Sequence, residues 1–126
     1  MLTLSVDPGH SVGFAVHRWH DLVLVGMMVS EDWADGGLLG ISRMFEPFAL
    51  AVVEAIPTSG QDEKTAMVYA YTVITCRDIL KIETKVISPG TWKPLQAKTP
   101  GKWRDHAQDA ERLGKFAIAQ YMDARF

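Results

Sequence analysis

The sequence predicts a single α/β domain in which a five-stranded mixed sheet is flanked by helices. Apolar and polar residues alternate over residues 2–7, as in a strand that buries one face. Residues 48–54 are almost entirely apolar, which is typical of a central parallel strand covered by helices on both sides. Elsewhere apolar residues recur at helical intervals. With 126 residues, 48% of them hydrophobic, the chain suits one domain over residues 1–126.

Three antiparallel strands are predicted first. The opening strand ends at Pro8-Gly9, because proline cannot donate to a sheet ladder and glycine permits a tight turn. Apolar stretches resume at residues 12–18 and 22–30, and the short connection at residues 19–21 suits a hairpin.

The middle of the chain alternates helices and strands. Residues 31–37 are polar and contain glycine, so we expect a connection there, followed by a short helix over 38–48 that ends near Glu46-Pro47. A strand at 48–55 and a loop at 56–61 lead to a helix at 64–80, opened by Asp62 and Glu63. Its apolar positions predict packing in the core or, in part, against a partner chain; they are Ala66, Met67, Ala70, Val73 and Ile74, with Tyr69, Tyr71 and Cys76 broadening the stripe.

The last third predicts a short strand at 83–88, a single helical turn at 91–94 and a final helix from about residue 100 to residue 123. Thr99 can cap that helix with Pro100 at its first position. An apolar stripe would dock it on the sheet and consists of Ala110, Leu113, Ala117 and Tyr121.

Charge and cysteine content narrow the possible partners and the compartment. The net charge of −2 argues against a generic polyanion binder, yet residues 81–104 hold six basic residues and only one acid, as a nucleic-acid groove would require. A solvated surface is the alternative for such a run. Cys76 is the only cysteine, which excludes an internal disulfide and indicates a reducing compartment. The absence of a basic leader and of a long apolar run predicts a soluble protein that does not enter a membrane.

Two acids end two predicted strands. Asp7 closes the first strand and Glu54 closes the strand at 48–55. If these strands are parallel neighbours, their carboxyl ends lie about 5 Å apart and the two side chains can share a metal ion. We expect Asp7 to be fixed by the sheet and open to solvent at the turn. The alternatives are that Asp7 only stabilises the turn and that Glu54 is a strand-end charge reaching water.

The start of the final helix supplies further candidates. His106 and Asp109 are three residues apart and therefore project from one helical face. The small residues Ala107 and Ala110 would let the helix backbone approach the strands closely. Alternatively, His106 is a surface histidine and Asp109 complements the helix dipole.

In this order the motifs resemble the ribonuclease-H-like nucleases, and more narrowly the RuvC family of Holliday-junction resolvases in a compact, phage-type version. The matching motifs are Val6-Asp7-Pro8-Gly9 with Gly13, Val52-Val53-Glu54, Ser88-Pro89, and His106-x-x-Asp109-Ala110. The resemblance implies the ribonuclease-H-like fold and a location in the cytoplasm of a bacterial or phage-infected cell.

The resemblance also implies a two-metal endonuclease. Asp7 would be shared between two Mg²⁺ or Mn²⁺ ions, Glu54 and Asp109 would each complete one side, and His106 would be a ligand or an acid/base group. The implied partner is branched DNA, cut by a homodimer and contacted through Lys93, Lys98, Lys102 and Arg104. Two alternatives remain: a YqgF-type nuclease that processes ribosomal RNA precursors, and an inactive module of this fold that binds nucleic acid or protein.

Overall fold

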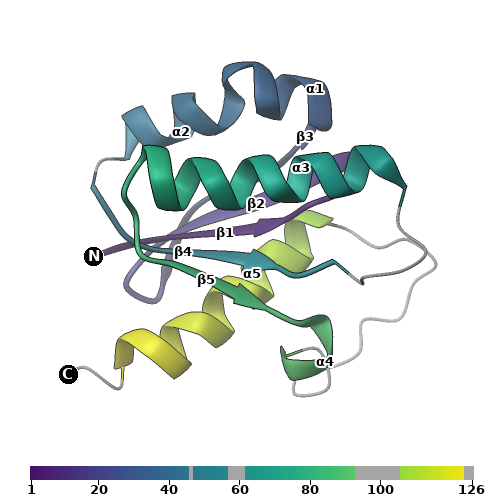
Figure 1. Ribbon diagram of the computed structural model, residues 1–126. Helices are drawn as coiled ribbons and strands as arrows, with labels where there is room; N and C mark the ends of the chain where they lie inside the picture. The colour runs from purple at the N-terminus through teal and green to yellow at the C-terminus, as the bar shows by residue number, and fades with distance from the viewer. Residues whose placement is uncertain (46, 57–61, 93–105, 124–126) are drawn as a thin grey trace.

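The computed structural model describes residues 1–45, 47–56, 62–92 and 106–123. Its five strands form one sheet in the order β3-β2-β1-β4-β5 (Figure 1). Strands β1 (Leu2–Asp7), β2 (Ser11–Arg18) and β3 (Asp21–Val29) pair antiparallel, whereas β4 (Phe48–Glu54) runs parallel to β1 and β5 (Thr84–Ile87) runs parallel to β4. The predicted mixed sheet, with three antiparallel strands followed by two parallel ones, is confirmed.

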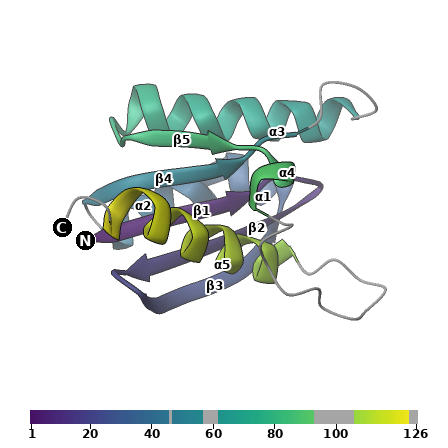
Figure 2. The same cartoon turned by 90° about the horizontal axis from the view of Figure 1, so that it is seen from below.

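Helices cover both faces of this sheet. On one face lie α1 (Ser30–Asp32), the wider turn η1 (Trp33–Gly37), α2 (Leu38–Met44), α3 (Glu63–Ile74) and its continuation η2 (Thr75–Ile79). On the other face α5 (His106–Ala117), continued by η4 (Ile118–Met122), crosses the strands diagonally (Figure 2). The short α4 (Pro89–Trp92) follows β5. The predicted start of the last helix near Pro100 lies outside the described residues.

Each face of the sheet has its own hydrophobic core. Val6 and Val53 pack with the α1–α3 layer, whereas the alternate residues Leu50 and Val52 pack beneath α5. Strand β4 is therefore buried on both sides, as its apolar run predicts. The predicted docking stripe of α5 is also confirmed, because Ala110, Leu113 and Ala117 are fully buried.

The expected connection at residues 31–37 is instead largely helical. Trp33 is fully buried, and its Nε1 donates a hydrogen bond of 2.9 Å to Oγ1 of Thr72 on α3. Its ring also stacks on Phe14 at a centroid distance of 5.6 Å. Burying this large side chain between sheet and helix stabilises helical backbone there. The helix breaks at Asp35 and Gly36, and the φ of 115° at Gly36 favours glycine.

The stripe predicted to bury α3 is wrong for most of its members. Ala66, Met67, Ala70 and Ile74 are exposed and Val73 is only partly buried. The buried side of α3 and η2 is instead rich in threonine and consists of Thr65, Val68, Thr72 and Thr75, together with Cys76, which the prediction had included. Threonine can be buried here because its hydroxyl finds partners: Thr72 donates to the carbonyl of Val68 at 2.8 Å. The small and aliphatic members of the predicted stripe therefore lie mostly on the exposed side, whereas Tyr69 and Tyr71 are partly buried against the core.

None of the helices in the described ranges has the length and apolar character needed to cross a bilayer.

Candidate active site

Asp7 and Glu54 lie next to each other at the carboxyl ends of two parallel strands. Val6 of β1 is in register with Val53 of β4, so the residues that follow them are neighbours across the sheet. Both side chains lie on the α5 side, because Asp7 alternates with Val6, and Glu54 with Val53, whose side chains pack in the opposite core. The predicted neighbouring position of the two acids is thus found in the structure.

Both acids are buried, contrary to the expectation that Asp7 is open to solvent at the turn. Asp7 is 6% and Glu54 5% exposed. His106, the first residue of α5, lies against the side chain of Asp7. At this exposure Glu54 is not a strand-end charge reaching water. Ionisable groups are rarely buried without a partner or a function, so the burial of both acids marks this position as a candidate site.

His106, the first residue of α5, contacts Asp7 directly. Its Nδ1 donates to Oδ2 of Asp7 at 2.6 Å, because a carboxylate can only accept. This hydrogen bond raises the pKa of His106, and burial of the ring opposes the rise. The charges of Asp7, Asp109 and Glu54 raise the pKa further. All three predicted carboxylates therefore act electrostatically on one imidazole.

Small residues let α5 approach the strands at this point. Ser5 of β1 is paired with Ala15 of β2, and Asp7 with Gly13, all on the same sheet face. The hydroxyl of Ser5 donates to the carbonyl of Ala110 at 2.6 Å, which joins the middle of α5 to β1. Ser5 was not among the site residues predicted from the sequence. The sequence feature that could have identified Ser5 is the recurrence of small residues at alternate positions of the two strands β1 and β2.

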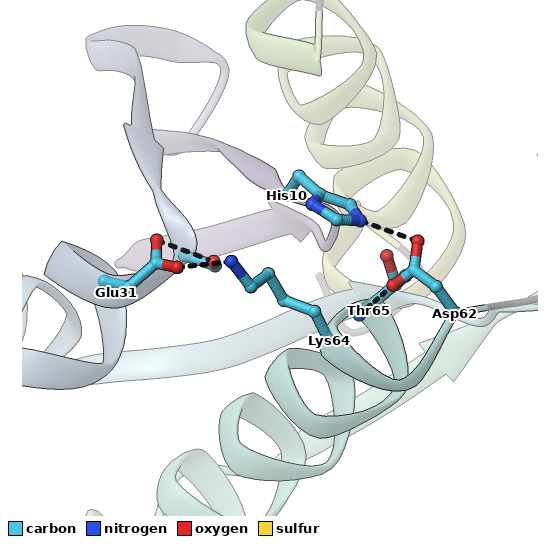
Figure 3. A network of polar contacts seen from close by, with 6 residues as sticks. His10, Glu31, Asp62, Lys64 and Thr65 are labelled. Carbon is cyan, nitrogen blue, oxygen red and sulfur yellow. Dashed lines mark hydrogen bonds and ion pairs between the residues drawn. The ribbon is translucent and has the colours of Figure 1, made fainter.

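A polar network links the segments that follow the two acids (Figure 3). His10, in the turn after Asp7, lies with its Nε2 2.6 Å from Oδ2 of Asp62. Asp62 caps α3, the helix that follows Glu54 in the chain, and accepts the backbone N–H of Thr65 at 2.8 Å. The Thr65 and His10 bonds hold the pKa of Asp62 at about 2. Beside it, Lys64 on α3 pairs with Glu31 at 2.5 Å. His10 was not among the site residues predicted from the sequence.

The donor set suits hard divalent cations in its chemistry. Asp7, Glu54 and Asp109 offer carboxylate oxygens, the ligands that Mg²⁺ and Mn²⁺ prefer. In the arrangement described, Asp7 is bonded to His106. Across the described ranges, no group of three or more His, Cys, Asp or Glu side chains is placed so that it could hold a metal ion as it stands. The predicted DNA contacts Lys93, Lys98, Lys102 and Arg104 lie outside the described residues.

Comparison with known proteins shows similarity in structure and not in sequence. No protein-family model matches the chain, and no curated protein matches it in sequence. Thermus thermophilus RuvC superposes with a TM-score of 0.73 at 15% identity, over 98% of this chain and 97% of RuvC. The same protein in complex with a Holliday junction substrate gives a TM-score of 0.71 at 14% identity, over 97% and 96% of the two chains. The Fowlpox virus Holliday junction resolvase gives 0.53 at 13% identity, over 98% and 99%. This protein therefore has the ribonuclease-H-like fold of the RuvC and poxvirus Holliday junction resolvases.

Proposed function

We propose that this protein is a metal-dependent endonuclease that cuts branched DNA, with four-way junctions as its substrate. The observation that carries the proposal is the convergence of Asp7, Glu54 and His106 where two parallel strands end and the last helix begins. A buried cluster of acids that no hydrophobic packing requires is typical of a functional site.

The chemistry proposed for the site is phosphodiester hydrolysis. Asp7, Glu54 and Asp109 would hold Mg²⁺ or Mn²⁺, and two such ions supply an activated water and stabilise the leaving oxygen. Burial orients the carboxylates of Asp7 and Glu54, since neither can rotate freely into solvent. His106 holds a proton at Nδ1 against Asp7, and its raised pKa suits a group that donates or accepts protons near neutral pH.

The choice of substrate rests on the fold. Two structures that resemble this chain, T. thermophilus RuvC and the Fowlpox virus resolvase, are complexes with Holliday junctions. Because one fold hosts many functions, this is support by analogy, and the site residues must be tested directly. The basic segment that contains Lys93, Lys98, Lys102 and Arg104 is the part of the chain proposed to contact the DNA backbone.

The proposed assembly is a homodimer. Cutting two opposed strands of a junction needs two active sites, and one chain supplies one. The exposed face of α3 is the surface proposed for the contact, since Met67 is 64% and Ile74 48% exposed. The exposed Ala66 precedes Met67, and the exposed Ala70 lies between Met67 and Ile74, so at helical spacing the four residues offer one apolar face to a second copy.

The decisive experiment compares cleavage of labelled substrates by the full chain. A four-way junction, a linear duplex, single-stranded DNA and a structured RNA are incubated with Mg²⁺, Mn²⁺ or EDTA. We expect paired nicks in the four-way junction with Mg²⁺ or Mn²⁺ and no nicks with EDTA. Asp7→Asn, Glu54→Gln and Asp109→Asn should each lower the cleavage rate a hundredfold or more, since each would weaken the binding of a metal ion whose charge is worth several kcal/mol (about two or more factors of ten) at the reacting phosphate.

The matched control is Asp35→Asn, which removes one exposed carboxylate in η1 and should leave cleavage unchanged. Junction binding by all four variants should persist. Cleavage of RNA alone would favour the YqgF-type alternative, and binding without cleavage under any condition would favour the inactive module.

A further inference from the structure

The backbone of α5 occupies the space that a side chain at residue 13 would need. A Cβ atom placed on Gly13 would lie 1.9 Å from the carbonyl oxygen of His106, 2.2 Å from its carbonyl carbon and 2.8 Å from the backbone nitrogen of Ala107. Real Cβ atoms essentially never come within 3.0 Å of such atoms. All three obstacles are main-chain atoms, so no change of rotamer can make room.

Close approach, and not backbone conformation, explains this glycine. Among the glycines in the described part of the chain, only Gly36 has a positive φ. Gly13 therefore sits in strand backbone that any residue can adopt, and the helix above it is the reason for the missing side chain.

Gly13 is also the residue directly opposite Asp7. The two are cross-strand partners in the β1–β2 ladder. The helix residue that rests on Gly13 is His106, whose ring reaches Asp7 at 2.6 Å. The contact between Gly13 and the backbone of His106 therefore determines both how closely the first turn of α5 approaches β2 and how far the His106 ring lies from Asp7. Asp109 lies three residues after His106 on α5, so its backbone position depends on the same approach of the helix to β2.

We propose that Gly13 is a positioning residue of the site: by leaving room for the backbone of His106, it sets the distance between the start of α5 and Asp7. The part of this inference that concerns metal binding rests on the proposed function. The part that concerns the Asp7–His106 contact does not.

Gly114 provides a matched control within the same helix. A Cβ at Gly114 would lie 2.7 Å from Oγ of Ser5 and 2.8 Å from Cε1 and Nδ1 of His17, so alanine there also crowds the contact between α5 and the sheet. These neighbours are side-chain atoms, and they lie away from the first turn. Gly114→Ala therefore disturbs helix docking without touching the backbone of His106.

The first measurement needs no metal. Long-range ¹H–¹⁵N correlation spectra of the histidine rings, recorded where the ring is neutral, show which nitrogen of His106 carries the proton. The wild type should carry it on Nδ1, facing Asp7. Gly13→Ala should lose this signature and Gly114→Ala should keep it. The proposal is overturned if Gly13→Ala keeps the signature or if both variants lose it alike.

The second measurement is Mn²⁺ affinity, followed by electron paramagnetic resonance. Gly13→Ala should weaken binding by about tenfold, as expected when support for a ligand is removed, while Gly114→Ala stays close to wild type. Equal weakening in both variants would overturn the proposal. If the wild type binds no Mn²⁺, the proposed function fails, and the ring spectra still decide the role of Gly13.

Thermal melts accompany both measurements, and trimethylamine N-oxide is added if Gly13→Ala is unstable, because it strengthens burial without contacting the site. If Gly13→Ala remains unfolded with this osmolyte, Gly13 is required for folding as a whole and the site-specific role is overturned.

Discussion

Nδ1 of His106 lies 2.6 Å from Oδ2 of Asp7, although the two residues are 99 positions apart in the chain. This bond joins the end of the first strand to the start of the last helix. Because the bond raises the pKa of His106, folding and protonation of this ring are linked.

The linkage predicts how the stabilising effect of His106 depends on pH. The folded pKa is raised above the ordinary value of 6.5, so the stabilisation is complete below pH 6.5 and is lost as pH rises through the folded pKa. Urea denaturation of the wild type and His106→Ala, in EDTA, should differ by on the order of 1 kcal/mol in free energy of unfolding at pH 6 and by less at pH 9. A difference that grows with pH would contradict the assigned hydrogen bond.

The basic segment predicts a salt-dependent affinity for DNA. Lys98→Ala combined with Lys102→Ala should weaken junction binding and lower the slope of log K against log salt by about two, since each phosphate contact releases roughly one counterion. Fluorescence anisotropy at several salt concentrations measures both effects. Lys81→Ala with Lys85→Ala provides a control of equal charge from the same basic third of the chain. An unchanged slope for the first pair would place the DNA elsewhere.

The exposed face of α3 predicts the oligomeric state. Met67→Glu should convert a dimer to a monomer in sedimentation equilibrium, because it introduces a charge into the proposed apolar contact. The melting temperature of the monomer should fall little, since Met67 is 64% exposed. Met44→Glu on α2, at a residue 70% exposed, is the matched control and should leave the dimer intact.

Two results would contradict this prediction. A monomeric wild type would rule out the homodimer. A dimer unaffected by Met67→Glu would point to the other exposed apolar stripe, on β3, where Val25, Met27 and Val29 are exposed.

His17 predicts sensitivity to acid. It is fully buried beneath α5, and in the described part of the chain neither ring nitrogen has a hydrogen-bond partner. Burial lowers its pKa below 6.5; Glu111 on α5 opposes this, while Lys115 and His20 add to it. Stability contributed by the neutral ring is therefore present above pH 6.5 and is lost as pH falls through the lowered pKa.

Replacing this ring should make the protein less sensitive to acid. His17→Leu removes the unpaired nitrogens and should leave the free energy of unfolding at pH 7 unchanged or raise it by about 1 kcal/mol. Between pH 6.5 and 4 the variant should lose less stability than the wild type in urea denaturation. A parallel pH dependence for His17→Leu and wild type would mean that His17 is not the group that titrates.

The order of strands and helices was readable from the sequence because it depends on local patterns. Alternation over residues 2–7 and the continuous apolar run over 48–54 each predict a strand from a local pattern, and both strands are found. The expectation that the first strand buries only one face was wrong, because helices cover both faces of the sheet and Thr3, Ser5 and Asp7 are buried as well. Asp7 and Glu54 could be predicted for the same reason, because a single carboxylate at the end of an apolar strand is visible as a local sequence pattern. Their adjacency needed one further step, the parallel pairing of β1 with β4, which the sequence suggests without fixing its register.

Tertiary contacts decided what local patterns leave open. Trp33 made residues 31–37 helical because its ring is buried against Phe14 and bonded to Thr72, partners remote in sequence. Hydrogen bonding by threonine hydroxyls chose the buried face of α3 against the apolar count. The burial of Asp7 and its bond to His106 depend on how closely α5 can approach β2. That approach is possible because Gly13 has no side chain to collide with the backbone of His106. Periodicity reports which residues prefer to be buried, whereas distances between segments far apart in the chain arise only when the whole core is packed.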